Sequence, residues 1–248
     1  MNFSIGLATA TVSAVFAALV LTRYFQRGGT HLLVWGLGLL LYFISGSTEV
    51  WLTFGWSDVA FRLWYWAGAI MVAAVLGQGS MHLLVRKPYV ATIFSVVIGI
   101  IALISFIWIF SLPLNANQFQ PHGDVGAFLT DSYKNILPQS VIRRTLPPIM
   151  NAYGTLLLVG GAIQSSLLFF RKQILPNRVL GNVLIALGGL LPATAGSIVK
   201  LAESTPELSA LGSTLKYLAI FAGVLVLFVG FQLATAGAPQ PKVKPALA

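Results

Sequence analysis

Residues 90–112 read VATIFSVVIGIIALISFIWIFSL, a run of 23 residues without a charged side chain. A helix of this length extends over about 35 Å, which exceeds the roughly 30 Å hydrocarbon core of a bilayer. The run is apolar all round, so it lacks the polar stripe that a helix on the surface of a soluble protein carries. Residues 90–112 therefore predict a transmembrane helix.

Six further apolar runs of similar length occur along the chain, whereas the ten-residue alternating segments of a membrane β-barrel are missing. We therefore expect an all-α integral membrane protein, a bundle of seven transmembrane helices in a single domain over residues 1–236. Residues 237–248, which contain Pro and Lys without periodicity, are expected to form a disordered tail. The predicted spans are residues 5–22, 32–54, 59–84, 90–112, 149–170, 179–200 and 211–234.

The composition agrees with this fold class. Hydrophobic residues make up 57% of the chain and charged residues 8%, and the mean hydropathy is +0.85. A soluble domain carries about 25% charged residues, so this chain has too few to cover a water-facing surface. The net charge of +9 does not indicate nucleic acid as a partner, because the basic residues form short clusters between apolar runs. The expected partner of most of the surface is the lipid bilayer.

The connections between the predicted spans alternate in charge. One set holds nine basic residues and no acidic residue, and the other set, with the adjoining helix ends, holds all six acidic residues and six basic ones. The positive-inside rule places the first set in the cytoplasm, so the N-terminus is expected outside and the tail inside, with the first span retained in the cell membrane, as for a bacterial cytoplasmic membrane protein. The nine are Arg23, Arg27, Arg86, Lys87, Arg171, Lys172, Arg178, Lys242 and Lys244.

The outer loop over residues 113–148 is much longer than the others. Asp124 can cap a helix that Pro138 must end, and the apolar residues between them recur on a single face. We consider two interpretations: an amphipathic helix in the outer interface or over the mouth of the bundle, and a loop that folds back to cover the bundle. The apolar face comprises Val125, Phe128, Leu129, Tyr133, Ile136 and Leu137.

Charged residues inside a bilayer are costly, so the few in the predicted spans are candidate site residues. Glu49 and Arg62 lie about equally far from the turn at residues 54–58, which predicts similar depth on neighbouring helices and an ion pair. Lys200 and Lys216 are likewise equidistant from Pro206. These groups are interpreted either as ion pairs that fix helices or as a polar site below the outer surface.

Uncharged polar residues form two further sets of candidates. Ser45, Ser47 and Thr48 belong to a run of five small or polar residues that ends at Glu49, which indicates a close-packed seam or, alternatively, an unwound segment along a ligand pocket. A second set toward the cytoplasmic side is interpreted as interhelical hydrogen bonds or as a shared pocket. This set includes Gln78, Gln164 and Asn182. Glycines on the fifth and sixth spans are expected at close helix contacts: Gly160, Gly161, Gly181, Gly188 and Gly189.

Cofactors and catalysis find little support in the sequence. A lysine in the last span raises retinal as a ligand, but the third span, FRLWYWAGAIMVAAVLGQG, has no carboxylate counter-ion, so retinal is not expected. The chain has no Cys and three isolated His residues, so no metal site is predicted. Walker loops, GxSxG and HExxH motifs are missing as well. We therefore expect a protein that is not an enzyme.

The function expected first is an accessory or scaffolding subunit of a larger membrane complex, in contact with other subunits or with copies of itself. A transporter or a lipid- or small-molecule-binding protein with a site near the outer face is the second hypothesis, with Glu49, Arg62 and Lys216 at that site. The third is a seven-helix sensor that signals through a separate partner.

Overall fold

The computed structural model describes residues 2–120, 129, 133–171, 176–203 and 212–235, without the side chains of residues 2, 196–203, 212 and 213. Seven of its helices are long and apolar enough to cross a membrane, and the described residues include no strand. The protein is therefore a polytopic helical membrane protein, which confirms the predicted class. The tail predicted at residues 237–248 lies outside the described residues.

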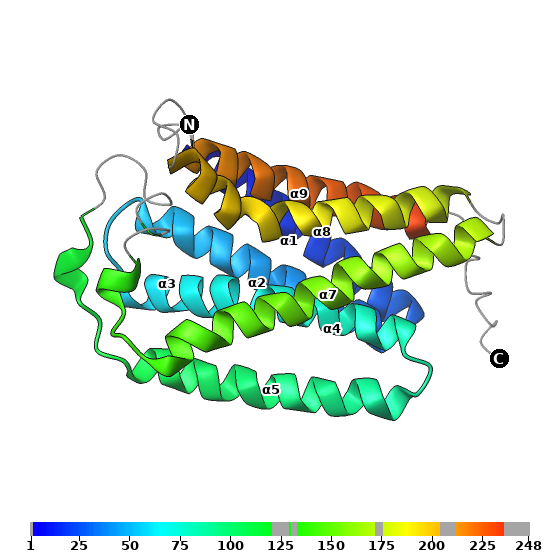
Figure 1. Cartoon of the computed structure of the whole chain (residues 1–248), viewed down its shortest axis with the longest axis horizontal. Coiled ribbons are helices and arrows are strands. Elements are labelled where there is room, and N and C mark those ends of the chain that lie inside the picture. The colour runs from blue at the N-terminus through cyan, green and yellow to red at the C-terminus, as the bar shows by residue number, and fades with distance from the viewer. Residues whose placement is uncertain (1, 121–128, 130–132, 172–175, 204–211, 236–248) are drawn as a thin grey trace, which may run out of the picture.

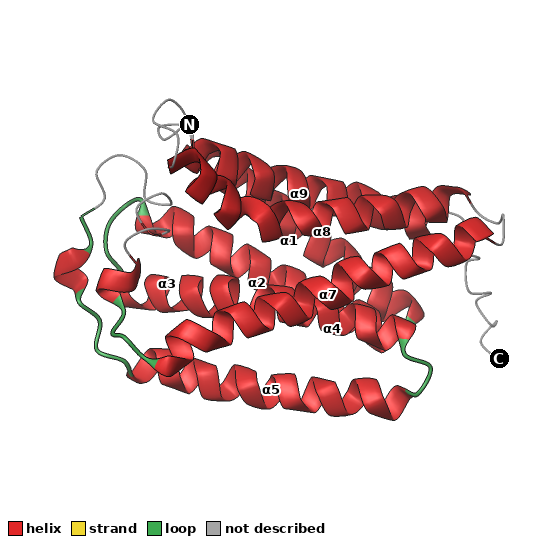
Figure 2. Ribbon diagram, in the orientation of Figure 1, coloured by secondary structure: helices red, strands yellow, loops and turns green. Residues whose placement is uncertain are grey.

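The spans run back and forth along one axis, and residues far apart in sequence lie side by side (Figures 1 and 2). Three consecutive elements, α3, the π-helix η1 and α4, form one continuous span, here called the third span. A 3₁₀ turn, η2, follows α5 at Ala116–Gln118. The helices are α1 (Asn2–Arg27), α2 (Thr30–Leu52), α3 (Asp58–Leu63), η1 (Trp64–Met71), α4 (Val72–Leu84), α5 (Pro88–Ser111), α7 (Val141–Arg171), α8 (Pro176–Glu203) and α9 (Gly212–Thr235).

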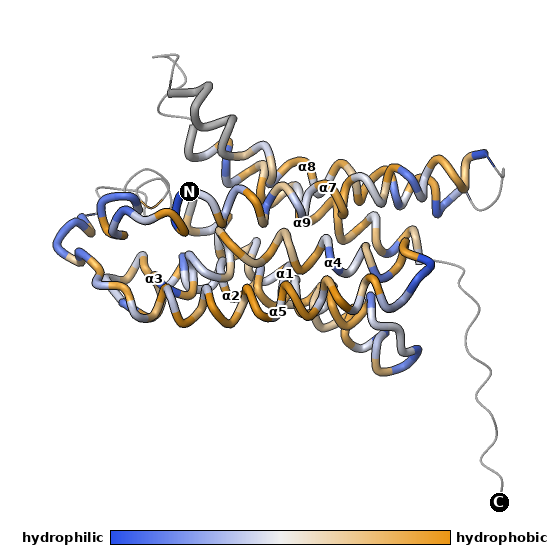
Figure 3. The backbone as a smooth tube through the Cα atoms, turned by 60° about the horizontal axis from the view of Figure 1, so that its bottom comes forward, coloured by the Kyte–Doolittle hydropathy of each residue, from blue (hydrophilic) through white to orange (hydrophobic). Residues whose placement is uncertain are grey.

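Hydrophilic residues gather at the two ends of the bundle, and hydrophobic residues follow the helices between them (Figure 3). We call the end with the α4–α5 connection the Arg86 end, and the end with the α2–α3 connection the Asp58 end. At the Arg86 end, Arg23 of α1 donates to Gln232 and Thr235 of α9, and its guanidinium lies 4.8 Å from the ring centre of Phe231. These contacts join the first and last spans.

Six of the seven spans form a closed ring. In order around it, α1 packs against α2, α2 against the third span, the third span against α7, α7 against α8, α8 against α9, and α9 against α1. The remaining helix, α5, lies outside the ring and packs against α4 and η1. Many of its apolar side chains are exposed, among them Val96, Ile100, Leu103 and Ile107. The six spans of the ring thus enclose the interior of the bundle, and α5 is not part of the ring.

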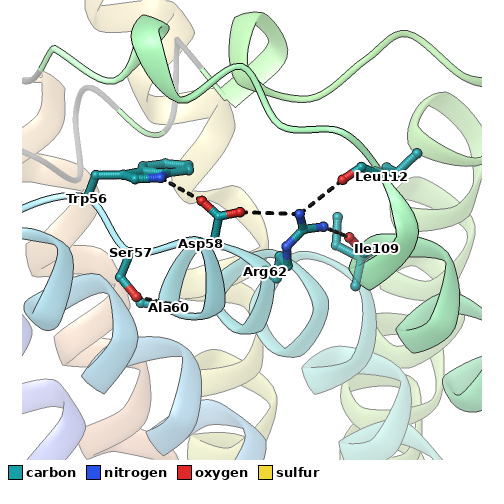
Figure 4. A network of polar contacts seen from close by, with 7 residues as sticks. All are labelled: Trp56, Ser57, Asp58, Ala60, Arg62, Ile109 and Leu112. Atoms are coloured by element: carbon teal, nitrogen blue, oxygen red, sulfur yellow. Dashed lines mark hydrogen bonds and ion pairs between the residues drawn. The ribbon is translucent and has the colours of Figure 1, made fainter.

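Polar contacts attach α5 to the third span at three levels, because aliphatic side chains alone bury little of this helix. The first level is a guanidinium at the Asp58 end (Figure 4), the second an indole near the middle, and the third an amide toward the Arg86 end. The contacts are Arg62 to the carbonyls of Ile109 and Leu112, Trp66 Nε1 to Ala102 O and Ser105 Oγ (3.1 Å each), and Gln78 Nε2 to Ala91 O (2.7 Å) and Ser95 Oγ (2.8 Å).

The predicted span boundaries agree with the structure within a few residues, except at the start of α7. This helix begins at Val141, eight residues before the predicted start at 149, and contains Pro147 and Pro148. Ser140 caps it, with its hydroxyl accepting from the Arg143 amide at 3.1 Å. The predicted start at residue 149 leaves both prolines outside the helix, whereas the helix accommodates both in its interior.

The described part of the long connection between α5 and α7 packs onto the Asp58 end. Leu129, Ile136 and Leu137 are almost fully buried in a cluster with Phe61 of α3, and the ring centre of Tyr133 lies 5.8 Å from that of Tyr65. This favours the interpretation that the segment folds back onto the bundle. Val125 and Phe128, the other residues of the predicted apolar face, lie outside the described residues.

Glycines bring helices into close contact, as expected. On the antiparallel helices α8 and α9, a Cβ at Gly181 would lie 2.7 Å from Gly230 O, and one at Gly188 would lie 2.8 Å from Gly223 O. A Cβ at Gly161 would collide with Leu84, and one at Gly189 would lie 3.2 Å from Leu158. Gly160 is different, because it is exposed and a Cβ there would meet nothing within 4 Å.

Candidate functional site

A cavity of about 310 Å³ lies inside the ring and is partly open. All six ring spans contribute to its wall, and α5 contributes nothing. Its volume is at the lower end of the range of small-molecule sites, about 300–1,000 Å³. Five of the candidates predicted from the sequence lie on α2 or α9, and three of them line the cavity: Ser45, Glu49 and Lys216.

Glu49 is the central polar group of the cavity. One carboxylate oxygen accepts a hydrogen bond from the hydroxyl of Tyr217 on α9, and the other accepts from Trp64 Nε1 in η1 at 3.3 Å. Side chains from two other spans therefore hold this carboxylate. A carboxylate has about four acceptor positions, so two bonds leave capacity for a ligand donor.

Lys216 lies next to Tyr217 on α9 and contributes to the same wall. Its ammonium is 5.5 Å from the ring centre of Tyr217, the residue whose hydroxyl bonds to Glu49. The cavity wall thus carries one negative and one positive group, both in contact with Tyr217.

The π-helix η1 forms part of the wall. Its wider turn is shown by the amide of Val72, which donates to Ala67 O five residues earlier. Side chains from two other spans bond to its carbonyl groups: Ser45 Oγ to Trp64 O at 3.4 Å, and Asn151 Nδ2 to Ala69 O at 2.7 Å. π-Segments are rare and often occur at functional sites, so its position here supports a functional cavity.

Further polar groups reach the cavity from α2 and α7. The Tyr42 and Thr155 hydroxyls line it, and neither makes a hydrogen bond with another residue in the described part of the chain. Asn151 donates two hydrogen bonds through Nδ2, to Ala69 O and to Pro147 O at 2.8 Å. These groups can hydrogen-bond a ligand or water.

Arg62 does not pair with Glu49, so the expected ion pair is replaced by other contacts. Arg62 is 9% exposed and turns toward α5, where its guanidinium donates to two backbone carbonyls (Figure 4). Its ion-pair partner is Asp58, four residues earlier on the same helix, at 3.4 Å. Asp58 also accepts from Trp56 Nε1 at 2.7 Å. Similar depth on neighbouring helices does not determine which side of its helix Arg62 faces.

The other outer candidates do not join the cavity wall. Thr48 bonds to its own helix, at Ile44 O (2.8 Å) and Ser45 O (3.0 Å), and Ser47 is not among the lining residues. α2 is helical throughout this run, so no unwound segment forms. The side chain of Lys200 lies outside the described residues.

The candidates toward the Arg86 end do not line this cavity. Gln78 is buried and accepts from the Tyr153 hydroxyl while it binds α5, whereas Gln164 is exposed. Asn182 donates to Arg178 O of its own helix at 2.9 Å. His82 contacts Ser95 Oγ at 2.7 Å, in line with a hydrogen-bonded chain through Gln78. Gln78 thus makes interhelical hydrogen bonds, the first of the two interpretations considered, whereas the bond of Asn182 is intrahelical.

Several cavity residues were not identified from the sequence. Trp64 and Tyr217 are two of them, since nothing in a sequence shows that these residues meet Glu49. The spacing of Asn151 and Thr155 could have identified them, because polar residues four apart occupy one face of an otherwise apolar helix. The described residues contain no group of three or more His, Asp or Glu side chains that could hold a metal ion.

No protein-family model matches the sequence, and comparisons with curated proteins and with solved structures found no match.

Proposed function

We propose that this protein binds a small molecule in the cavity inside the ring, as a receptor or transporter whose site opens toward the Asp58 end. The observation that supports this most directly is the Glu49 carboxylate, which Tyr217 and Trp64 hold from two other spans inside a cavity of about 310 Å³. A fixed charge with spare acceptor capacity in an otherwise apolar cavity is typical of a ligand site.

The proposal concerns binding and not catalysis. Within the described cavity wall there is a single carboxylate and no histidine, so no pair of groups is arranged for acid–base chemistry. We propose that the Asp58 end faces the outside of the cell membrane, because six basic residues without acidic neighbours lie at or near helix ends on the opposite side. These are Arg23, Arg27, Arg86, Lys87, Arg171 and Arg178. The segment that includes Leu129, Ile136 and Leu137 then covers the outer end of the bundle.

Thiol labelling tests cavity access and orientation together, because the chain has no Cys and each variant therefore has one thiol. We expect a membrane-impermeant methanethiosulfonate reagent, added to intact cells, to modify Thr155→Cys in the cavity and Asn135→Cys on the exposed surface of the Asp58 end. Arg86→Cys should react only after permeabilisation. The measurement is the fraction of purified protein that carries the label.

The matched control for cavity access is Ser13→Cys, since Ser13 is fully buried in α1 and does not line the cavity. If Thr155→Cys reacts no faster than Ser13→Cys in solubilised protein, the cavity is closed to water and the proposed function is wrong. If Arg86→Cys reacts in intact cells and Asn135→Cys does not, the orientation is reversed.

The accessory or scaffolding role is the second candidate, and the position of α5 outside the ring favours it. Its exposed apolar face is a surface on which another transmembrane helix can pack. Purification in mild detergent should then yield a partner protein at a fixed ratio, and the substitutions Ile100→Ala and Leu103→Ala should release it. A lone monomer that retains cavity ligand binding would contradict this candidate.

A further inference from the structure

The side chains near Glu49 in the cavity wall direct their hydrogen-bond donors to acceptors of the protein. The indole N–H of Trp64 and the hydroxyl of Tyr217 donate to Glu49 itself. The hydroxyl of Ser45 donates to Trp64 O at 3.4 Å. Lys216 has interactions of its own, and we assign it no contact with a ligand. The indole and hydroxyl donors around Glu49 are therefore used within the protein.

The part of the wall that α7 contributes follows the same pattern. Asn151 has two hydrogens on Nδ2, and it donates them to Ala69 O at 2.7 Å and to Pro147 O at 2.8 Å. Backbone carbonyls can only accept, so these two bonds also determine the orientation of the amide. What Asn151 can offer a ligand is its oxygen Oδ1, which accepts no hydrogen bond in the described part of the chain.

The polar groups that stay open in the described wall are mainly acceptors. Glu49 uses two of about four acceptor positions, and its carboxylate is the only negative group there. Asn151 Oδ1 is a second acceptor, and the hydroxyls of Tyr42 and Thr155 can each accept as well as donate. A ligand that satisfies this wall therefore donates several hydrogen bonds. A donor with a positive charge bonds to a carboxylate most strongly.

Away from Glu49 the cavity is apolar. Because the spans are antiparallel, position along each helix gives depth: Glu49 lies toward the Asp58 end, and Leu76 and Leu158 lie toward the middle. These two leucines also line a smaller pocket of about 30 Å³, whose wall is apolar except for the indole N–H of Trp35. That N–H donates to Leu76 O at 3.0 Å. The part of a ligand that extends away from Glu49 therefore meets carbon surface.

We propose that the ligand is a protonated amine with an apolar group, of the class of the primary and secondary amines with an aromatic or branched aliphatic substituent. Its ammonium donates to Glu49 and to the other open acceptors of the wall, and its apolar group extends toward Leu76 and Leu158. The rings of Tyr42 and Trp64 in the same wall also suit an ammonium group. This inference rests on the proposed binding function and specifies its ligand class.

Four compounds that share a phenethyl group separate charge from hydrogen-bond donation. Phenethylamine has a positive charge and N–H donors, whereas trimethyl(phenethyl)ammonium has the charge without donors. 2-Phenylethanol has a donor without charge, and 3-phenylpropionate has a negative charge. The measurement is the dissociation constant of each compound for the unmodified chain in detergent, by calorimetric titration near neutral pH. We expect phenethylamine to bind about tenfold more tightly than the others, because it alone makes charge-assisted hydrogen bonds to the carboxylate.

The substitution Glu49→Gln removes the negative charge and keeps the size of the side chain. It should weaken phenethylamine by about tenfold or more and change the affinity for 2-phenylethanol little. The matched control is Thr48→Val, because Thr48 precedes Glu49 but bonds to its own helix and does not line the cavity. It should leave all four dissociation constants unchanged. The unfolding midpoint of each variant without compound shows whether it folds as the unmodified chain does.

The outcomes separate this inference from the function on which it rests. The amine inference is overturned if any of the other three compounds binds as tightly as phenethylamine, or if none binds although Thr155→Cys is labelled; the cavity then remains an open binding site. If Thr155→Cys is labelled no faster than Ser13→Cys and no compound binds, the binding function fails as well. The compound series uses the unmodified chain, so it decides the inference even if Glu49→Gln does not fold.

Discussion

Replacement of Gly154 by alanine should destabilise the protein by about 3 kcal/mol, the upper part of the usual range for overpacking in a tightly packed interior. Gly154 of α7 lies directly against the backbone of α4, and a Cβ there would collide with the carbonyl of Ala73 and lie 2.6 Å from the amide of Ala74. Backbone atoms cannot rotate away as a side chain can. α7 would have to separate from the third span, and the cavity wall between them would change shape.

The matched control is Gly160→Ala, in the same helix. Gly160 is exposed and a Cβ there meets nothing within 4 Å, so the substitution should stabilise the helix slightly, by about 0.5–1 kcal/mol. The measurement is the thermal unfolding midpoint in detergent for both variants. Equal midpoints would show that α4 and α7 are not in close contact at Gly154.

Removal of the guanidinium in Arg62→Met should cost about 3 kcal/mol, since hydrogen bonds to charged groups contribute about 1.5–3 kcal/mol and two carbonyls would lose their donor. Arg62 is largely buried and donates to Ile109 O and Leu112 O, at the end of α5 where helical carbonyls have no partner within the helix. A cation at a helix C-terminus also interacts favourably with the helix dipole. α5, which lies outside the ring, would be held at two levels instead of three.

A control at Asp58 separates the carbonyl contacts from the ion pair. The side chain of Asp58 is 56% exposed, so its pair with Arg62 is screened by solvent and Asp58→Asn should cost less than about 1 kcal/mol. Urea unfolding in mixed micelles gives both values. Equal losses for Arg62→Met and Asp58→Asn would mean that the ion pair, and not the attachment of α5, is what Arg62 provides.

The sequence predicted the helices well because the bilayer imposes a strong constraint on each one separately. Seven apolar runs gave seven spans, with ends displaced by only a few residues outside α7. The predicted start of α7 was wrong because it left Pro147 and Pro148 outside the helix. A sequence does not reveal whether neighbouring spans compensate for the helical hydrogen bonds that proline removes. The π-segment Trp64–Met71 left no trace, since an i→i+5 turn has the same apolar composition as an α turn.

The site was predictable only in part. A sequence indicates the depth of a residue in the membrane, but it does not indicate the direction in which its side chain points. Glu49 and Lys216 were found by asking which charged groups are costly in a bilayer, and Ser45 was found as part of a run of small and polar residues. The structure brings all three to one cavity. Arg62 satisfied the same criterion but faces α5 on the other side of its helix. The contact between Glu49 and Tyr217 joins residues 168 positions apart, which hydropathy in a single sequence cannot reveal.

The π-segment gives the third span a way to move that needs no loop and no hinge. If its i→i+5 bonds were exchanged for i→i+4 bonds, the part of the span before Trp64 would rotate about the helix axis relative to the part after Met71. The two side chains that bond to its carbonyls, Ser45 and Asn151, border the cavity and hold the present register. A molecule that replaced either bond when it bound would then rotate the part of the third span at the membrane surface, next to Asp58.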